Sequence, residues 1–118
     1  MDDNITLKNI KNEVQRFCEA REWDQFHNPK ELAIGISTEA NELLELFRFQ
    51  SEEQMEQMLK DSQMRTKIGE ELADTFFFVL RFAQMNQFDL QEILADKLEK
   101  NERRYSVEKS KGRNQKID

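Results

Sequence analysis

The sequence has few residues that break helices or cross-link a chain. It holds one proline, three glycines and one cysteine among 118 residues. So few breaks favour long helices over a sheet, and a chain of this length makes one small domain. The single cysteine, Cys18, has no partner for a disulfide within the chain, which indicates a reducing compartment and predicts a cytoplasmic protein.

Long apolar runs and targeting signals are also missing. No run approaches the roughly 20 apolar residues of a membrane-spanning helix, and residues 1–13 lack the regions of a secretory signal peptide. The net charge is -6, but it is uneven, because residues 1–96 sum to -10 and residues 97–118 to +4. An acidic body binds DNA poorly, so we expect neither a nucleic acid nor a membrane as partner.

Apolar residues recur at helical spacing along nearly the whole chain. They predict four long helices and a short one, with an aromatic loop at 23–27 and no strand. Asn28 before Pro29, Ser51 with Gln54, and Asp89 with Glu92 are typical of helix starts. The expected helices therefore span about residues 6–22, 29–49, 52–60, 62–86 and 90–105.

The helix expected at 62–86 is apolar on most sides in its second half, at residues 75–80. Such a helix is buried all round, and in so short a chain this indicates burial between subunits. We therefore expect an all-α fold, a four-helix-type bundle with one extra short helix that dimerisation completes. The helical domain would span residues 1–107, followed by a polar, mobile tail at 108–118.

Two acidic pairs lie where apolar residues are expected. At about 100° per residue, Glu39 falls among the apolar residues of its helix and Glu71 among those of the helix at 62–86. Glu42 and Asp74, three residues further on, are offset from the apolar arcs by a similar angle. One such pair alone would indicate a solvated surface, but four carboxylates together repel unless cations neutralise them.

The residue types in these pairs point to a hard metal ion. Carboxylate oxygens suit Mg²⁺ or Mn²⁺, and helical pairs at i, i+3 can direct two carboxylates at one ion. Di-iron bundles add a histidine at i, i+3, which is absent here, so the pattern favours magnesium over iron.

The last helix replaces its apolar stripe with polar side chains after Leu94. Lys97, Asn101 and Arg104 lie on the same arc as Ile93. These donors suit phosphate oxygens, but an exposed helix end that leaves the core would give the same pattern.

Four motifs in order carry a family resemblance: WDQFH at 23–27, EANELLE at 39–45, EELAD at 70–74 and KLEKNERRY at 97–105. Together they resemble the MazG-like all-α nucleoside triphosphate pyrophosphohydrolases, in the small branch with dCTP pyrophosphatases and integron-cassette MazG proteins. Each acidic pair is a weak signal, but the set in this order is specific. The resemblance covers roughly residues 10–112.

The resemblance implies a helical homodimer or homotetramer that converts a (d)NTP, such as dCTP, to the monophosphate and pyrophosphate in nucleotide-pool house-cleaning. It implies Mg²⁺, or Mn²⁺. Reasoning from the charges, we choose Glu42 as the carboxylate that would take a proton from water. Phe49 and Phe78 replace a Trp and a Tyr of the family, and Ser106 stands where a Pro is common. The implied ligands are Glu39, Glu42, Glu71 and Asp74 for metal, with Glu42 and Glu71 catalytic; Lys97, Asn101, Arg104 and Tyr105 for phosphate; and Trp23, His27, Phe49 and Phe78 for the base.

Two alternatives stay open at this stage. A phosphoribosyl-ATP pyrophosphohydrolase is disfavoured because it does not need the aromatic loop. A non-catalytic helical module that binds a nucleotide or a protein would bind metal without turnover. Among the aromatic residues, Phe78 and Trp23 suit either a core or a base site.

Overall fold

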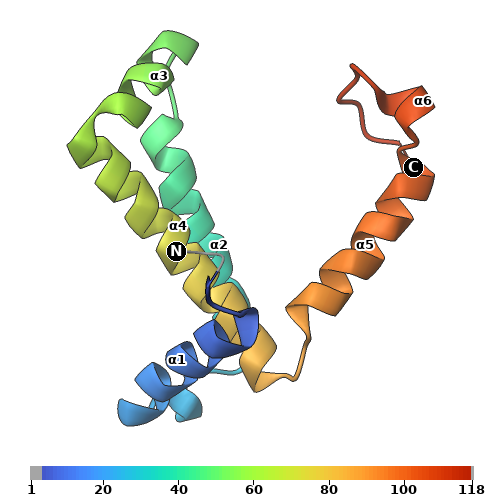
Figure 1. Ribbon diagram of the computed structural model, residues 1–118. Coiled ribbons are helices and arrows are strands. Elements are labelled where there is room, and N and C mark those ends of the chain that lie inside the picture. The colour runs from blue at the N-terminus through green and yellow to red at the C-terminus, as the bar shows by residue number, and fades with distance from the viewer. Residues whose placement is uncertain (1–3, 118) are drawn as a thin grey trace. The chain divides into compact units, whose positions relative to one another are not determined.

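A computed structural model describes residues 4–117, and within that range the chain is helical with no strand. All five expected helices are present, with ends within two residues of the predicted ones, so the all-α prediction is confirmed. A 3-10 turn lies in the aromatic loop, and a sixth helix follows the fifth (Figure 1). The elements are α1 (Leu7–Ala20), η2 (Trp23–Gln25), α2 (Pro29–Phe47), α3 (Glu52–Lys60), α4 (Ser62–Met85), α5 (Leu90–Arg104) and α6 (Val107–Ser110).

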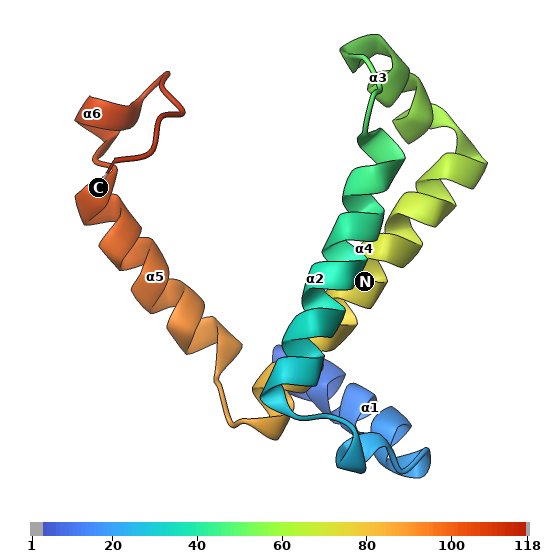
Figure 2. The same cartoon turned by 180° about the vertical axis from the view of Figure 1, so that it is seen from behind.

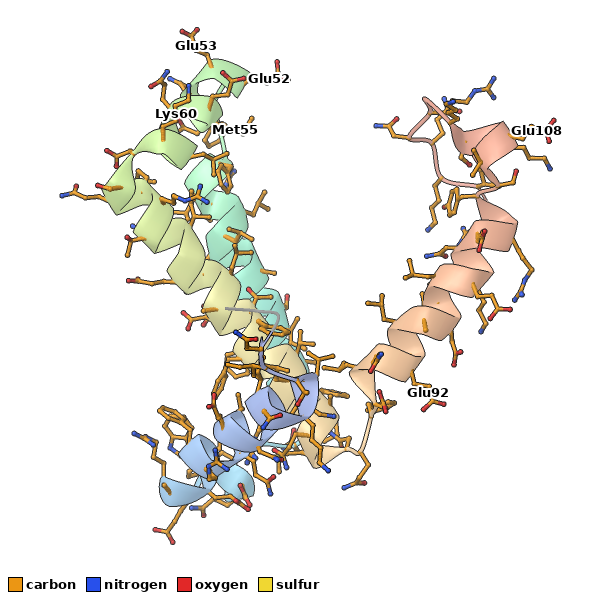
Figure 3. All side chains as sticks on the ribbon, in the orientation of Figure 1. Glu52, Glu53, Met55, Lys60, Glu92 and Glu108 are labelled. Atoms are coloured by element: carbon orange, nitrogen blue, oxygen red, sulfur yellow. The ribbon has the colours of Figure 1, made fainter. Side chains whose placement is uncertain are left out.

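The predicted caps begin their helices. The Asn28 side chain accepts a hydrogen bond from the backbone N–H of Glu31 at 2.8 Å. Ser51 and Gln54 form the full capping box, each side chain accepting from the other's backbone N–H. Asp89 accepts from the backbone N–H of Glu92 at 3.0 Å, and Figure 3 shows the Glu92 side chain projecting away from the first turn of α5. These bonds satisfy backbone donors that a helix start leaves unpaired.

The chain divides into two compact units, one through Asn86 and one from Gln87 onward. In the first, α2 and α4 lie side by side and antiparallel, and α1 packs near the C-terminal end of α4 (Figures 1 and 2). The short helix α3 connects α2 to α4 and contacts α4. The buried apolar residues come from three helices and form a small core: Cys18, Leu32, Ile68, Leu80 and Ala83.

A glycine allows α2 to approach α4 closely. A Cβ atom at Gly35 would lie 2.6 Å from the Phe78 ring, nearer than real Cβ atoms come to a neighbour. Gly35 lies one turn before Glu39, and Phe78 one turn after Asp74. This contact therefore fixes the register that sets the two acidic pairs opposite each other.

The second half of α4 is only partly covered within one chain. Leu80 and Ala83 are buried, whereas Phe76 is 43% exposed and Phe77, Phe78 and Val79 are half-buried. The all-round burial that the sequence indicated is thus not reached by one copy, and dimerisation stays a prediction. No described helix combines the length and apolar character that a membrane span requires.

The second unit contains α5 and α6. The Tyr105 hydroxyl accepts a hydrogen bond from the Ile117 N–H at 3.1 Å, and Arg104 Nε donates to the Ile117 carbonyl. The segment after α5 therefore folds back on the end of that helix. Helix α6, which includes Glu108 (Figure 3), spans the expected domain boundary at residue 107, and the mobility of the tail stays a prediction.

Candidate functional site

Of the four carboxylates that the sequence singled out, three converge from α2 and α4. Glu39 and Glu42 on α2 and Glu71 on α4 each offer an oxygen within 4.8 Å of the others. Glu39 and Glu71 are half-buried, and Glu42 is exposed. The Oε2 atoms of Glu39 and Glu71 are buried without a hydrogen-bond partner, which is unusual because buried polar atoms normally have one.

Burial and neighbouring carboxylates make the ionisation of Glu39 and Glu71 unfavourable. Burial, and then the neighbouring Glu42 carboxylate, raise the pKa of Glu39 to about 7. The same two causes raise the pKa of Glu71. Carboxylates held near one another and partly out of water favour the protonated form unless a cation neutralises them.

Asp74 lies at the edge of this group. Its side chain is exposed, and its charge contributes to the raised pKa of both Glu39 and Glu71. Glu45, which the turn of about 100° per residue directs away from the apolar arc of α2, is exposed and pairs with Arg48 at 3.3 Å. The structure thus separates the acids that converge from the one that faces solvent.

This donor set fits a hard divalent cation. All of its ligand atoms are carboxylate oxygens, the class that Mg²⁺ and Mn²⁺ prefer. Two of these oxygens are buried and unpartnered, and a cation would supply both the missing partner and the missing charge. Glu39, Glu42 and Glu71 are the residues that would hold it, with Asp74 beside them.

Three of the four expected base-binding residues gather at the aromatic loop and the C-terminal half of α4. The Trp23 ring lies edge-to-face with His27 at 6.0 Å and with Phe17 at 5.6 Å between centroids. Phe17 continues the contacts to Phe77, which in turn meets Phe78. The rings therefore form one connected aromatic cluster.

Phe49 is not brought to that cluster by a single chain. It follows the C-terminal end of α2, whereas the aromatic loop precedes its N-terminal end. Phe49 is 87% exposed, adopts a positive φ of 66° and stacks under the Arg48 guanidinium. Its role at a base stays a prediction.

The sequence reasoning missed Arg81. This residue is 1% exposed, and its guanidinium donates through Nε to His27 Nδ1 at 2.9 Å and through Nη1 to Gln84 at 2.6 Å. Its Nη2 forms an ion pair with Asp24 of the aromatic loop. Burial, and then the positive charge of Arg81, lower the pKa of His27. The available signal was a single basic residue within an apolar run, which needs partners when buried.

The expected phosphate-binding residues lie in the second unit, along one face of the last turns of α5. Lys97 is exposed, and Asn101 and Arg104 are half-buried. The Arg104 guanidinium lies 5.2 Å from the centre of the Tyr105 ring. The spacing of i, i+4 and i+7 keeps the first three on one face, and their role with phosphate stays a prediction.

Known proteins resemble this chain over most of its length. A dCTP pyrophosphatase 1 from Bos taurus is 32% identical over 107 residues, which are 91% of this chain and 63% of that protein. The Homo sapiens protein of the same name is 30% identical over 100 residues, 85% of this chain and 59% of that protein. The chain thus spans roughly three fifths of the length of these relatives.

A solved structure has the same fold. It is a pyrophosphatase from Archaeoglobus fulgidus DSM 4304, which superposes with a TM-score of 0.78 at 31% identity and covers 84% of this chain and 91% of that one. The model of the MazG-like family matches residues 34–118, which include both acidic pairs and the whole of α5. Because this match takes in most of the chain, the protein belongs to the MazG-like family.

Proposed function

We propose that this protein is a Mg²⁺-dependent nucleoside triphosphate pyrophosphohydrolase that converts a (d)NTP to the monophosphate and pyrophosphate. The observation that carries the proposal is the cluster of three carboxylates with two buried, unpartnered oxygens. The relatives named dCTP pyrophosphatase support a deoxynucleotide substrate such as dCTP. Removal of such nucleotides is the house-cleaning role that we infer, in a reducing compartment such as the cytoplasm, which suits the buried free thiol of Cys18.

The order of residues along α4 supports a nucleotide lying beside this helix. Glu71, Asp74, Phe78 and Arg81 follow one another at steps of three or four, so they share one face. From Glu71 to Arg81 the helix rises about 15 Å. A nucleotide in this direction would place its phosphates at the carboxylates and its base at the aromatic cluster.

The chemistry follows from the charges. A metal ion held by Glu39, Glu42 and Glu71 would neutralise phosphate charge and make water more acidic. Glu42, the exposed acid of the three, accepts the proton of the attacking water as general base. The new bond joins the water oxygen to phosphorus, and the bond between the α- and β-phosphates breaks to release pyrophosphate. For Lys97 and Arg104 on α5 we propose a phosphate-binding role, because their donor groups suit phosphate oxygens.

We infer that two copies of the chain form the working unit. An apolar groove on α4 is lined by Leu72, Ala73, Thr75, Phe76 and Val79. In the second unit, Leu94 and Leu98 on α5 are each 58% exposed. Each of these two exposed apolar sets, taken by itself, is a candidate interaction surface, and a second copy is the partner that would cover the groove on α4. Sedimentation analysis distinguishes the monomer from a dimer or tetramer.

The activity test is release of pyrophosphate from each dNTP in the presence of Mg²⁺. We expect Glu71→Gln to lower kcat more than about a hundredfold, because the amide removes a charged ligand. The matched control is Glu70→Gln, which changes the neighbouring, exposed glutamate and should retain activity. No release by the folded wild-type protein with any nucleotide would refute the proposal, and metal binding without turnover would favour a non-catalytic nucleotide-binding module.

A further inference from the structure

The buried guanidinium of Arg81 has three polar partners, two in the aromatic loop and one on α4. Each of its three guanidinium nitrogens donates a hydrogen bond: Nε to His27, Nη1 to Gln84 and Nη2 to Asp24. A buried cation is unfavourable unless it is paired, and an apolar side chain of similar volume usually serves stability as well. We therefore ask what these hydrogen bonds do for function, in addition to allowing the guanidinium to be buried.

The bond to His27 determines where that ring carries its proton. Nδ1 accepts from Arg81 Nε at 2.9 Å, so this nitrogen presents a lone pair and carries no hydrogen. A neutral imidazole with Nδ1 unprotonated has its proton on Nε2. A doubly protonated ring would place an N–H against the guanidinium, and the lowered pKa of His27 agrees with the neutral form.

We propose that Arg81 is a positioning residue that holds His27 as the neutral imidazole protonated at Nε2, so that Nε2 donates a hydrogen bond to the base of the substrate. The inference rests on the proposed function, because it places the base beside His27. An Nε2–H donor selects an acceptor atom, either a carbonyl oxygen or an unprotonated ring nitrogen. Asp24 takes part indirectly, since its ion pair holds the guanidinium in place.

The location of Arg81 agrees with this role. It lies three residues, or about one turn, beyond Phe78 on α4, on the face that leads from the acidic pairs toward the aromatic loop. Trp23, whose ring meets His27 edge-to-face, completes the surroundings of the imidazole. A hydrogen-bond donor fixed at this point would contact the base of a nucleotide whose phosphates lie at the carboxylates.

The direct test uses the fact that His27 is the only histidine in the chain. Long-range proton–nitrogen NMR of the nucleotide-free wild-type protein should show one imidazole, protonated at Nε2 and unprotonated at Nδ1, from about pH 8 down to below the usual range of histidine. Arg81→Met should shift the ring toward a mixture of tautomers and raise the pH at which it titrates. The exposed Arg65→Met on the same helix is the matched control and should leave the spectrum unchanged. A wild-type ring protonated at Nδ1 would overturn the inference, whether or not the variant folds.

The kinetic test separates positioning from structure. We expect Arg81→Met to raise KM for the preferred dNTP about tenfold, the loss of one well-placed hydrogen bond to the ligand, with kcat within about twofold. In a His27→Ala background, the same change should raise KM no further, because Arg81 acts through the ring. An additional tenfold rise in that background would overturn the inference. If the wild-type protein shows the expected tautomer but no turnover, the proposed activity is refuted while the hydrogen bond from Arg81 to His27 is supported. The failure of one proposal can therefore be told from the failure of the other.

Discussion

The two charged clusters that α4 shares with its neighbours differ in how their charges are balanced. At Glu39, Glu42 and Glu71, three acids converge with no ion pair to a basic side chain among residues 4–117, and two of their oxygens are buried without hydrogen bonds. At Arg81, one buried cation has an acid, an imidazole and an amide around it. A cluster of like charges is stabilised by binding a ligand of opposite charge. A cluster whose charges are paired internally holds its own side chains in place. The first therefore suits binding and chemistry, and the second suits positioning.

If the Arg81 cluster is balanced by Asp24, removing that acid should destabilise the protein. We expect Asp24→Asn to lower the free energy of unfolding by about 2 kcal/mol, because a buried guanidinium loses its ion pair, although Asp24 itself is partly exposed. Urea unfolding measures the change, and Glu13→Gln, an exposed acid on α1, is the control. If the two variants are equally stable, Asp24 does not balance the charge of the buried Arg81 guanidinium.

The opposition of the two acidic pairs depends on the close approach at Gly35. Gly35→Ala should lower the free energy of unfolding by about 1–2 kcal/mol, since the new methyl group overlaps the Phe78 ring and forces it to move. It should also weaken Mg²⁺ binding, because α2 and α4 separate near the carboxylates. Gly69→Ala, where a Cβ meets no atom within 4 Å, is the control and should stabilise the helix slightly. If Gly35→Ala binds Mg²⁺ as tightly as the wild type, the contact between Gly35 and Phe78 does not position the carboxylates.

The unbalanced cluster should bind metal in a pH-dependent way. With the pKa of Glu39 near 7, a metal ion must displace a proton at lower pH. The affinity for Mg²⁺ should therefore rise about tenfold from pH 6 to pH 8 and level off above the pKa. Titration calorimetry at several pH values measures this, and an affinity that is constant across the range would contradict the raised pKa.

The smallest expected effect is on the stability of the metal-free protein. Because the pKa of Glu39 is raised from 4.5 to about 7 on folding, the folded state holds the proton more tightly, and its contribution to stability is lost as the pH rises through 7. Glu39→Gln should thus raise the Tm of metal-free protein at pH 8 by a few degrees and have little effect near pH 4. Glu45→Gln, at a position directed away from the apolar arc of α2, is the matched control, and a lower Tm for Glu39→Gln at pH 8 would show that the cluster is balanced.

The contrast between the clusters also explains which of them could be read from the sequence. The acidic pairs can be recognised in the sequence because carboxylates at i, i+3 interrupt two apolar arcs. Helix geometry alone places each pair on one side of its helix. The partners of Arg81 cannot be found in this way, since His27 and Asp24 lie 54 and 57 residues away in the chain. Only the packing of the aromatic loop against α4 brings them together.

Local patterns in the sequence predicted four long helices and a short one, the N-caps of three of them and the two acidic pairs, because periodicity and capping act over a few residues. Tertiary structure decided that the pairs oppose each other, since this depends on the approach of α2 to α4 at Gly35 and Phe78. It also decided that His27 contacts Arg81, and that Phe49 lies apart from the aromatic cluster within one chain. These are contacts between residues far apart in the chain, and they depend on side-chain packing that local patterns do not specify.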